Sequence, residues 1–144
     1  MSTTTYARIG AVFFVLWGLL HIVGGGAILA AAAGGAEAGY AIYQNSAGPF
    51  PPVAGAILSY FAFQLVWLGA LVAAIGATLN WRNSALGLAL NTALAGLTDL
   101  GLVIFLAVPG YVSWPEAAIG IVLFLVAAVA GGIGCRPVAA KAAR

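Results

Sequence analysis

The chain has 144 residues, of which 64% are hydrophobic and only 6% are charged, whereas a soluble domain is about 45–50% apolar and about 25% charged. This balance, with a mean hydropathy of +1.12, excludes an ordinary soluble domain and predicts an integral membrane protein. The formal net charge of +2 is too small and too dispersed for nucleic-acid binding, and the single Cys135 excludes an internal disulfide.

Four apolar runs are long enough to cross a bilayer, which takes about 20 helical residues. They cover roughly residues 9–33, 53–79, 85–108 and 117–134. The first run is about twice as long as the apolar core of a signal peptide, so we interpret it as a retained span. The sequence therefore predicts an all-α integral membrane protein in which residues 1–144 form one bundle of four transmembrane helices.

The segments between these runs carry turn and capping signals. Residues 34–52 are rich in glycine and end in two prolines, which suits a loop that leads into a helix. Within this loop, the stretch 40–46 is expected to form a short amphipathic piece over the outer mouth of the bundle. Ser84 can cap the third helix, and Ser113 with Glu116 has the spacing of a capping box for the fourth.

The placement of charge predicts the orientation of the bundle. Glu37 and Glu116 fall in the first and third loops, and the basic residues fall at the N-terminus, in the second loop or after the fourth run: Arg8, Arg82, Arg136, Lys141 and Arg144. Four crossings put those last three places on one side of the membrane. By the positive-inside rule both termini are then cytoplasmic, and the predicted location is a bacterial inner membrane.

Two ionisable side chains lie deep inside the predicted spans. Asp99 is about 20 Å from the inner end of its helix, and His21 is about 18 Å from the inner end of its own, so both belong to one layer. Gln64 lies near the middle of the second span, and Asn91 shares a polar, small-residue face with Asp99. The fourth helix contributes only small and aliphatic residues at this depth, and we expect it to act as a scaffold.

Ionisable residues inside a membrane are costly and usually face the bundle interior, where they are functional by default. A His21–Asp99 pair, direct or through water, can hold and pass a proton near neutral pH. We therefore predict that these two are the catalytic residues of an isomerase, cyclase or hydrolase that acts on a lipophilic small molecule. The predicted substrate-binding residues are two amides and three aromatic walls: Gln64, Asn91, Trp17, Tyr60 and Trp67.

Two other functions fit the same pattern. One is a proton-coupled small-molecule transporter that works as a dimer, since intramembrane acid and imidazole groups form proton relays. The other is an accessory or assembly subunit, in which the pair only staples two helices and the amides join helices to one another. Small-residue ridges on the second and fourth helices permit a homodimer or a larger partner: Gly69, Ala73 and Ala77, and Ala128 with Gly132.

No metal or cofactor is expected. The chain has one histidine and one cysteine, at opposite ends, which is too few ligands for a metal cluster or a bis-histidine haem site within one chain. The expected partners are membrane lipid, a lipophilic ligand and a second copy of the chain.

Overall fold

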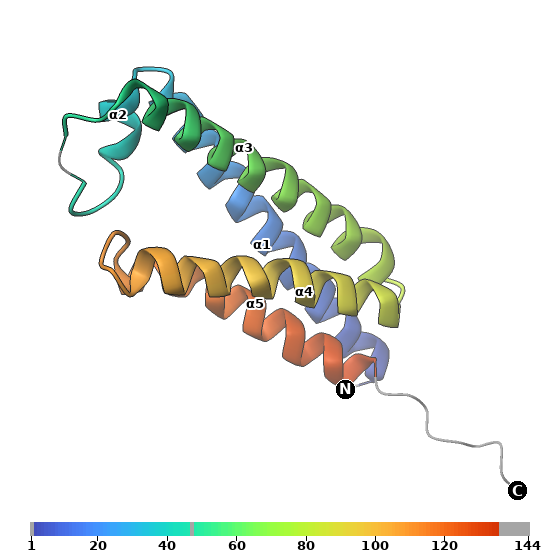
Figure 1. Cartoon of the computed structure of the whole chain (residues 1–144). Helices are drawn as coiled ribbons and strands as arrows, with labels where there is room; N and C mark the ends of the chain where they lie inside the picture. The colour runs from blue at the N-terminus through green and yellow to red at the C-terminus, as the bar shows by residue number, and fades with distance from the viewer. Residues whose placement is uncertain (1, 47, 136–144) are drawn as a thin grey trace, which may run out of the picture.

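The structure is a computed structural model that describes residues 2–46 and 48–135 (Figure 1). The elements in this described part are α1 (Thr3–Ala32), α2 (Ala36–Tyr40), α3 (Pro52–Ile75), η1 (Gly76–Asn80), α4 (Ala85–Leu102), η2 (Val103–Ala107) and α5 (Trp114–Gly134), where η marks a π-helical segment. Four of the described helices are long and apolar enough to cross a membrane, when α3 and α4 are taken with their π-helical extensions. The predicted all-α, four-helix membrane fold is confirmed.

The helices begin where side chains cap them. Ser2 caps α1, its Oγ accepting a first-turn backbone N–H at 3.2 Å, so that this helix begins at Thr3 rather than near residue 9. The predicted capping box of the last helix is confirmed and starts α5 at Trp114: Ser113 Oγ accepts the Glu116 N–H at 3.4 Å, and Glu116 Oε2 accepts the Ser113 N–H at 3.1 Å.

Two of the transmembrane helices end in π-helical turns that the hydrophobic pattern does not reveal. The N–H of Trp81 donates to the carbonyl of Gly76 at 3.1 Å, and the N–H of Val108 donates to that of Val103 at 2.9 Å. Each is a bond over five residues instead of four. Such turns are rare and often stand at functional sites, and η2 forms part of the cavity wall described below.

The first helix, α1, lies at the centre of the fold and packs along both α3 and α5 (Figure 1). Where it meets α3, a Cβ atom added to Gly69 would lie 2.5 Å from the carbonyl oxygen of Gly18. Where it meets α5, a Cβ added to Gly10 would lie 2.7 Å from the backbone nitrogen of Gly131. The backbones therefore touch at both crossings, and a side chain at these positions would separate them.

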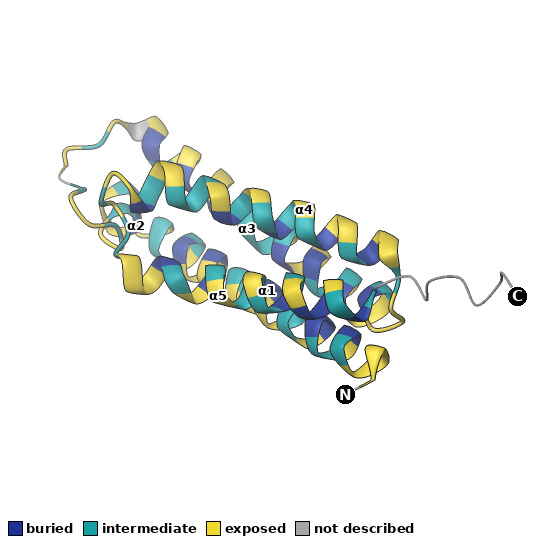
Figure 2. Cartoon of the chain, turned by 90° about the horizontal axis from the view of Figure 1, so that it is seen from below, coloured by how far each residue is buried: buried dark blue, intermediate teal, exposed yellow. Residues whose placement is uncertain are grey.

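The helix α4 packs on the central helix α1 through side chains, not through close backbone contacts at glycines. The core cluster draws on all four long helices and consists of Phe14, Trp17, Val72, Ala95 and Ala127. Figure 2 shows that such buried residues follow the inward faces of the helices, while exposed residues cover the outward faces. Towards the end that carries α2, the α4–α5 pair diverges from the α1–α3 pair (Figure 1).

The two ends of the bundle differ in charge. The start of α1, the turn 81–84 and the end of α5 lie at one end, where Asn83 Nδ2 donates to the carbonyl of Gly134 at 3.0 Å. At this end the Arg8 guanidinium lies 5.3 Å from the centre of the Trp81 ring. The acidic residues Glu37 and Glu116 stand in the α2 region and at the start of α5, at the opposite end. The remaining basic residues of the orientation argument, Arg136, Lys141 and Arg144, lie outside the described residues.

The close approach of α1 and α3 can be tested with matched alanine substitutions in one helix. Gly18→Ala should lower the free energy of unfolding by about 1–3 kcal/mol, because its methyl group meets the backbone of α3. Gly24→Ala should be neutral or stabilising, since an added Cβ there has nothing within 4 Å and alanine favours helix. Thermal unfolding in detergent measures both, and equal stability of the two variants would contradict this packing.

Candidate functional site

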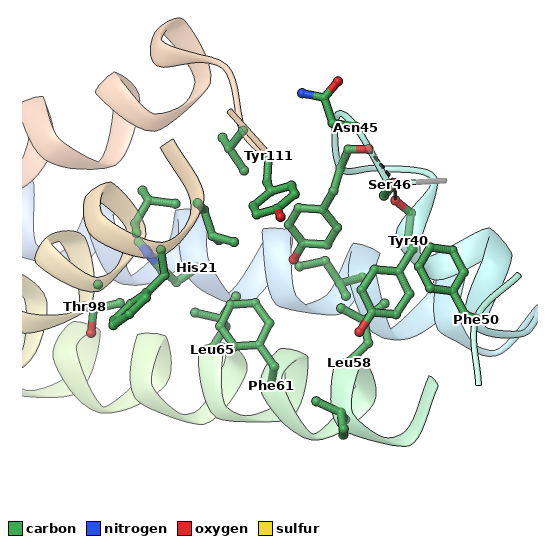
Figure 3. A pocket seen from close by; sticks show the side chains of 18 of the residues that line it. His21, Tyr40, Asn45, Ser46, Phe50, Leu58, Phe61, Leu65, Thr98 and Tyr111 are labelled. Atoms are coloured by element: carbon green, nitrogen blue, oxygen red, sulfur yellow. Dashed lines mark hydrogen bonds between the residues drawn. The ribbon is translucent and has the colours of Figure 1, made fainter. Parts of the chain in front are cut away.

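A cavity of about 920 Å³ lies between α1, α3 and α4 in the half of the bundle that carries α2 (Figure 3). Its walls are mainly aliphatic and aromatic, and no Asp, Glu, Lys or Arg is among the residues that line it. Phe61 of α3 and Phe105 of η2 stand on opposite walls and are also exposed on the outer surface of the bundle. These two cavity walls therefore also face the surroundings of the helices. None of its lining residues comes from α5, which agrees with the scaffold role expected for that helix.

Hydrogen bonds join two loops at the end of the cavity near α2. The N–H of Gln44 donates to the carbonyl of Tyr111 at 2.8 Å, and Asn45 Nδ2 donates to the carbonyl of Gly110 at 3.0 Å. Ser46 Oγ lies within hydrogen-bond distance of two carbonyls of its own loop, at 2.6 and 2.7 Å. The stretch 40–46 thus covers this end of the cavity as expected, although it forms turns and the short helix α2 precedes it.

Aromatic side chains line this covered end. Tyr40 stacks on Phe50 with ring centres 4.4 Å apart, and the ring centre of Tyr43 lies 6.3 Å from that of Tyr40. Tyr111 also lines this end (Figure 3). Burial, with the neighbouring Tyr40 adding to it, raises the pKa of Tyr43 to about 12. Its hydroxyl therefore keeps its proton at all physiological pH values and can donate a hydrogen bond to a ligand at this end.

His21 and Thr98 stand at the deep end of the cavity (Figure 3). The Thr98 hydroxyl donates to the carbonyl of Leu94 at 2.7 Å, which leaves its lone pairs free. His21 Nδ1 lies 2.9 Å from the carbonyl oxygen of Trp17. Because a carbonyl only accepts, Nδ1 must carry a proton, and Nε2 is the nitrogen left for other partners. Among the described residues Nε2 has no hydrogen-bond partner.

Trp17 joins His21 to Asp99. The indole ring is fully buried and stacks on the imidazole with ring centres 3.6 Å apart and planes 23° from parallel. Its N–H is shared between Oδ1 and Oδ2 of Asp99, each 3.2 Å away. On the other side, a Cβ added to Gly120 would lie 3.4 Å from Asp99 Oδ1 and 3.8 Å from His21 Cε1. The His21 imidazole and the Asp99 carboxylate thus both lie next to the same small space, beside Gly120 of α5.

The layer predicted from helical depth is therefore present. Within residues 2–46 and 48–135 no hydrogen bond joins His21 directly to Asp99; both side chains contact Trp17, the imidazole by stacking and the carboxylate through the indole N–H. Asp99 is 4% exposed and does not line the cavity. Trp17, predicted as a wall of the ligand site, is buried behind His21 and contacts the acid instead. His21 is the one predicted site residue that reaches the cavity in the described part of the chain.

Asn91 lies apart from this layer, closer to the end of the bundle that carries the turn 81–84. Its side chain is fully buried, and Nδ2 donates to the carbonyl of Val72 at 3.1 Å, while Oδ1 has no hydrogen-bond partner among the described residues. The bond to Val72 joins α4 to α3. Its predicted contact with a ligand in the cavity has no support in this placement, because the helix turns the amide towards a neighbouring backbone.

Gln64, Tyr60 and Trp67 also lie away from the cavity. They share the face of α3 opposite the one that contacts α1, where Tyr60 is 65% and Trp67 44% exposed. The indole N–H of Trp67 donates to Gln64 Oε1. The close contact of Gly69 with α1 sets this rotation of α3, so the three side chains point outwards instead of into the predicted ligand site.

Several cavity residues escaped the sequence analysis. Phe61, Leu65 and the residues of η2 look like ordinary apolar positions, and nothing in their spacing separates a cavity wall from a lipid-facing surface. Thr98 carried a usable signal, since it lies beside Asp99 on the same polar stripe. Within the described residues no three His, Cys, Asp or Glu side chains lie close enough to hold a metal ion.

Comparisons with known proteins give no family to which the site could be referred. No protein-family model, no curated protein and no solved structure matches the chain.

The Trp17–Asp99 bond can be tested by a double-mutant cycle. Trp17→Phe removes the N–H and leaves a buried carboxylate without its donor, which should cost about 1–3 kcal/mol of unfolding free energy in addition to the lost packing. In an Asp99→Leu background, Trp17→Phe should cost clearly less, since no acceptor is left unpaired. Unfolding in mixed detergent micelles gives the four free energies. A coupling free energy near zero would rule out the bond.

Proposed function

We propose that this protein binds a neutral lipophilic small molecule from the membrane and carries out acid–base chemistry on it with His21. One observation supports this most: the imidazole stands at the deep end of an otherwise uncharged apolar cavity, with Nε2 free of partners among the described residues. Pockets of about 300–1,000 Å³ with apolar walls and a few polar groups are typical small-molecule sites.

The cavity favours a ligand of limited length with a polar atom at one end or at both. His21 and Ile28 both line it and are two helical turns apart, which corresponds to about 10 Å along α1. A polar atom at the deep end would meet His21 Nε2 and the Thr98 hydroxyl. An apolar body would lie against Phe61 and Phe105, and a second polar group would reach Tyr43 at the covered end.

In this proposal His21 gives and takes the proton. The bond from Nδ1 to the Trp17 carbonyl holds the ring in one tautomer, so Nε2 acts as the base and, once protonated, as the acid. Asp99 is a positioning residue: it anchors the indole on which the imidazole stacks, and its carboxylate borders the same space beside Gly120. Isomerisation, cyclisation and hydrolysis all use such a group.

Transport is the weaker alternative, because the inner half of the described bundle has few polar side chains that could line a path for a solute or a proton. The buried polar residues there are Asn80 and Asn91, and the Asn91 amide donates to the backbone carbonyl of Val72. Flux of a small molecule driven by a pH gradient in proteoliposomes would support the transporter against the enzyme.

We further propose that both termini are cytoplasmic and that the protein resides in a bacterial inner membrane. Arg8 and Arg82 stand at the same end of the bundle, and Glu37 and Glu116 at the other. Positively charged loop residues favour the cytoplasmic side. The cavity would then lie in the outer half of the membrane and open into its outer leaflet.

Occupancy of the cavity can be tested with a matched pair of glycine substitutions. An added Cβ has nothing within 4 Å at Gly101, which lines the cavity, or at Gly132, which lies on α5 away from it. In nanodiscs that contain a diazirine-bearing long-chain alcohol, light should label the wild type at Leu58 and Leu65, which line the cavity and are not exposed on the outer surface. Gly101→Leu should lose at least about four-fifths of this labelling if a branched side chain fills the pocket, and Gly132→Leu should keep it. Equal labelling of both variants would refute a ligand cavity at this place.

The chemistry is tested in the same preparations with isotopic water. Proteoliposomes made with total neutral lipid of the source membrane are incubated in D₂O with H₂¹⁸O, and the lipids are analysed by mass spectrometry. Proton transfer by His21 should place deuterium in one lipid class, or ¹⁸O if the reaction is hydrolysis. His21→Phe should reduce the incorporation by at least about a hundredfold, the usual scale of general acid–base catalysis. Incorporation that is unchanged in His21→Phe would exclude the proposed role.

The orientation predicts which introduced cysteines a membrane-impermeant maleimide can reach. In a Cys135→Ser background and intact spheroplasts, Glu37→Cys should be labelled from outside, and Arg82→Cys only after the membrane is permeabilised. Both parent side chains are exposed, so accessibility within the protein does not limit either reaction. The reverse pattern would invert the topology.

A further inference from the structure

A stripe on α3 faces away from the rest of the chain and carries a polar side chain near the middle of a membrane span. Its residues follow the alternating spacing of three and four that forms the seam of packed transmembrane helices, and we call them the α3 seam: Tyr60, Gln64, Trp67, Leu71 and Ala74 of α3, and Thr78 of its extension η1. All are exposed apart from Gln64, which is half-buried. The opposite face of α3, with Ala62 and Gly69, packs on α1.

Gln64 makes this stripe more than a lipid-facing surface. It lies about 18 Å from the start of α3 and about 24 Å from the end of η1, so it cannot reach either membrane interface. Its Oε1 accepts the indole N–H of Trp67, but its Nε2 donates to no partner among the described residues. An amide donor without a partner in hydrocarbon is unfavourable, since no water replaces the missing bond.

We propose that the α3 seam is the interface of a homodimer in which Gln64 pairs with Gln64 of a second copy. Copies inserted with the same orientation are related by a two-fold axis along the membrane normal, so their α3 helices run parallel and equivalent residues meet. An amide is self-complementary: each Nε2 donates to the other copy's Oε1, which has a second lone pair beside the one used by Trp67.

A second copy explains the seam better than lipid or an unrelated protein. Lipid tails offer nothing to the amide, and an unrelated chain would have to bring a matching group to the same depth. In a homodimer, the two-fold axis brings Gln64 of one copy to Gln64 of the other, so one residue supplies both hydrogen-bonding partners. Tyr60 and Trp67 flank Gln64 by one turn on each side and would pack against the partner helix. This surface also differs from the small-residue ridges that the sequence suggested for a dimer, of which Gly69 and Ala73 are already used against α1.

Cysteine cross-linking in native membranes tests the geometry without touching Gln64. In the full chain with Cys135→Ser, Leu71→Cys lies one heptad from Gln64 on the α3 seam, and Val129→Cys lies on α5 with 61% exposure of the parent side chain. Oxidation should produce a symmetric disulfide dimer of Leu71→Cys at least about ten times faster than of Val129→Cys, because only the former apposes its own copy. Equal rates would overturn the proposed interface.

The role of the amide is tested by energy transfer between labelled copies in liposomes at varied protein-to-lipid ratio. Gln64→Leu should weaken dimerisation roughly five- to tenfold, as expected for the loss of two interhelical hydrogen bonds of average strength. Phe63→Leu, a neighbouring exposed position off the seam, is the matched control and should leave the dissociation constant unchanged. A wild type that stays monomeric at every ratio, or a Gln64→Leu variant that dimerises like wild type, would refute the proposal. Both readouts are independent of ligand binding, so they do not depend on the proposed function.

Discussion

The close approach of α1 to α3 and α5 is the constraint on which the rest of the structure depends. Glycines at both crossings let the backbones touch, so α1 becomes the helix that two others surround. That contact fixes the rotation of α3, and the rotation decides which of its residues face the cavity and which face outwards. In hydrocarbon there is little hydrophobic force between helices, and close van der Waals packing of this kind supplies much of their association.

The third transmembrane helix, α4, is held to α1 by a side-chain hydrogen bond and by side-chain packing instead of backbone contact. Trp17 extends from α1 into the core and shares its N–H between the two carboxylate oxygens of Asp99. The same indole supports the His21 ring by stacking and by the adjacent carbonyl. A single buried tryptophan therefore couples the packing of α4 to the orientation of the imidazole, and loss of this side chain would disturb the fold and the site together.

Polar groups in this bundle divide into three settings with different consequences. Asn91 donates to the backbone of a neighbouring helix and serves helix packing, although its Oδ1 has no partner among the described residues. His21 stands at the edge of an apolar space, where a free ring nitrogen is available to a ligand. Gln64 stands on the outside, where the membrane cannot satisfy it and a symmetric partner can. The cost of burying each group in hydrocarbon is similar in kind, but the position of each in the fold decides whether it bonds to a neighbouring helix, lines the cavity or faces outwards.

Hydropathy and capping chemistry alone determined the four spans, most of their ends, and the depth at which His21 and Asp99 share a layer, because these follow from helical rise and local hydrogen bonds. The sequence could not determine the rotation of each helix about its axis. Rotation depends on contacts between segments far apart in the chain, such as Gly18 with Gly69, so only the tertiary structure placed Trp17 in contact with both the imidazole and the acid. For the same reason, only the tertiary structure shows that Gln64, Tyr60 and Trp67 face outwards. It also forms the cavity from apolar residues whose spacing in the sequence does not mark them as cavity walls.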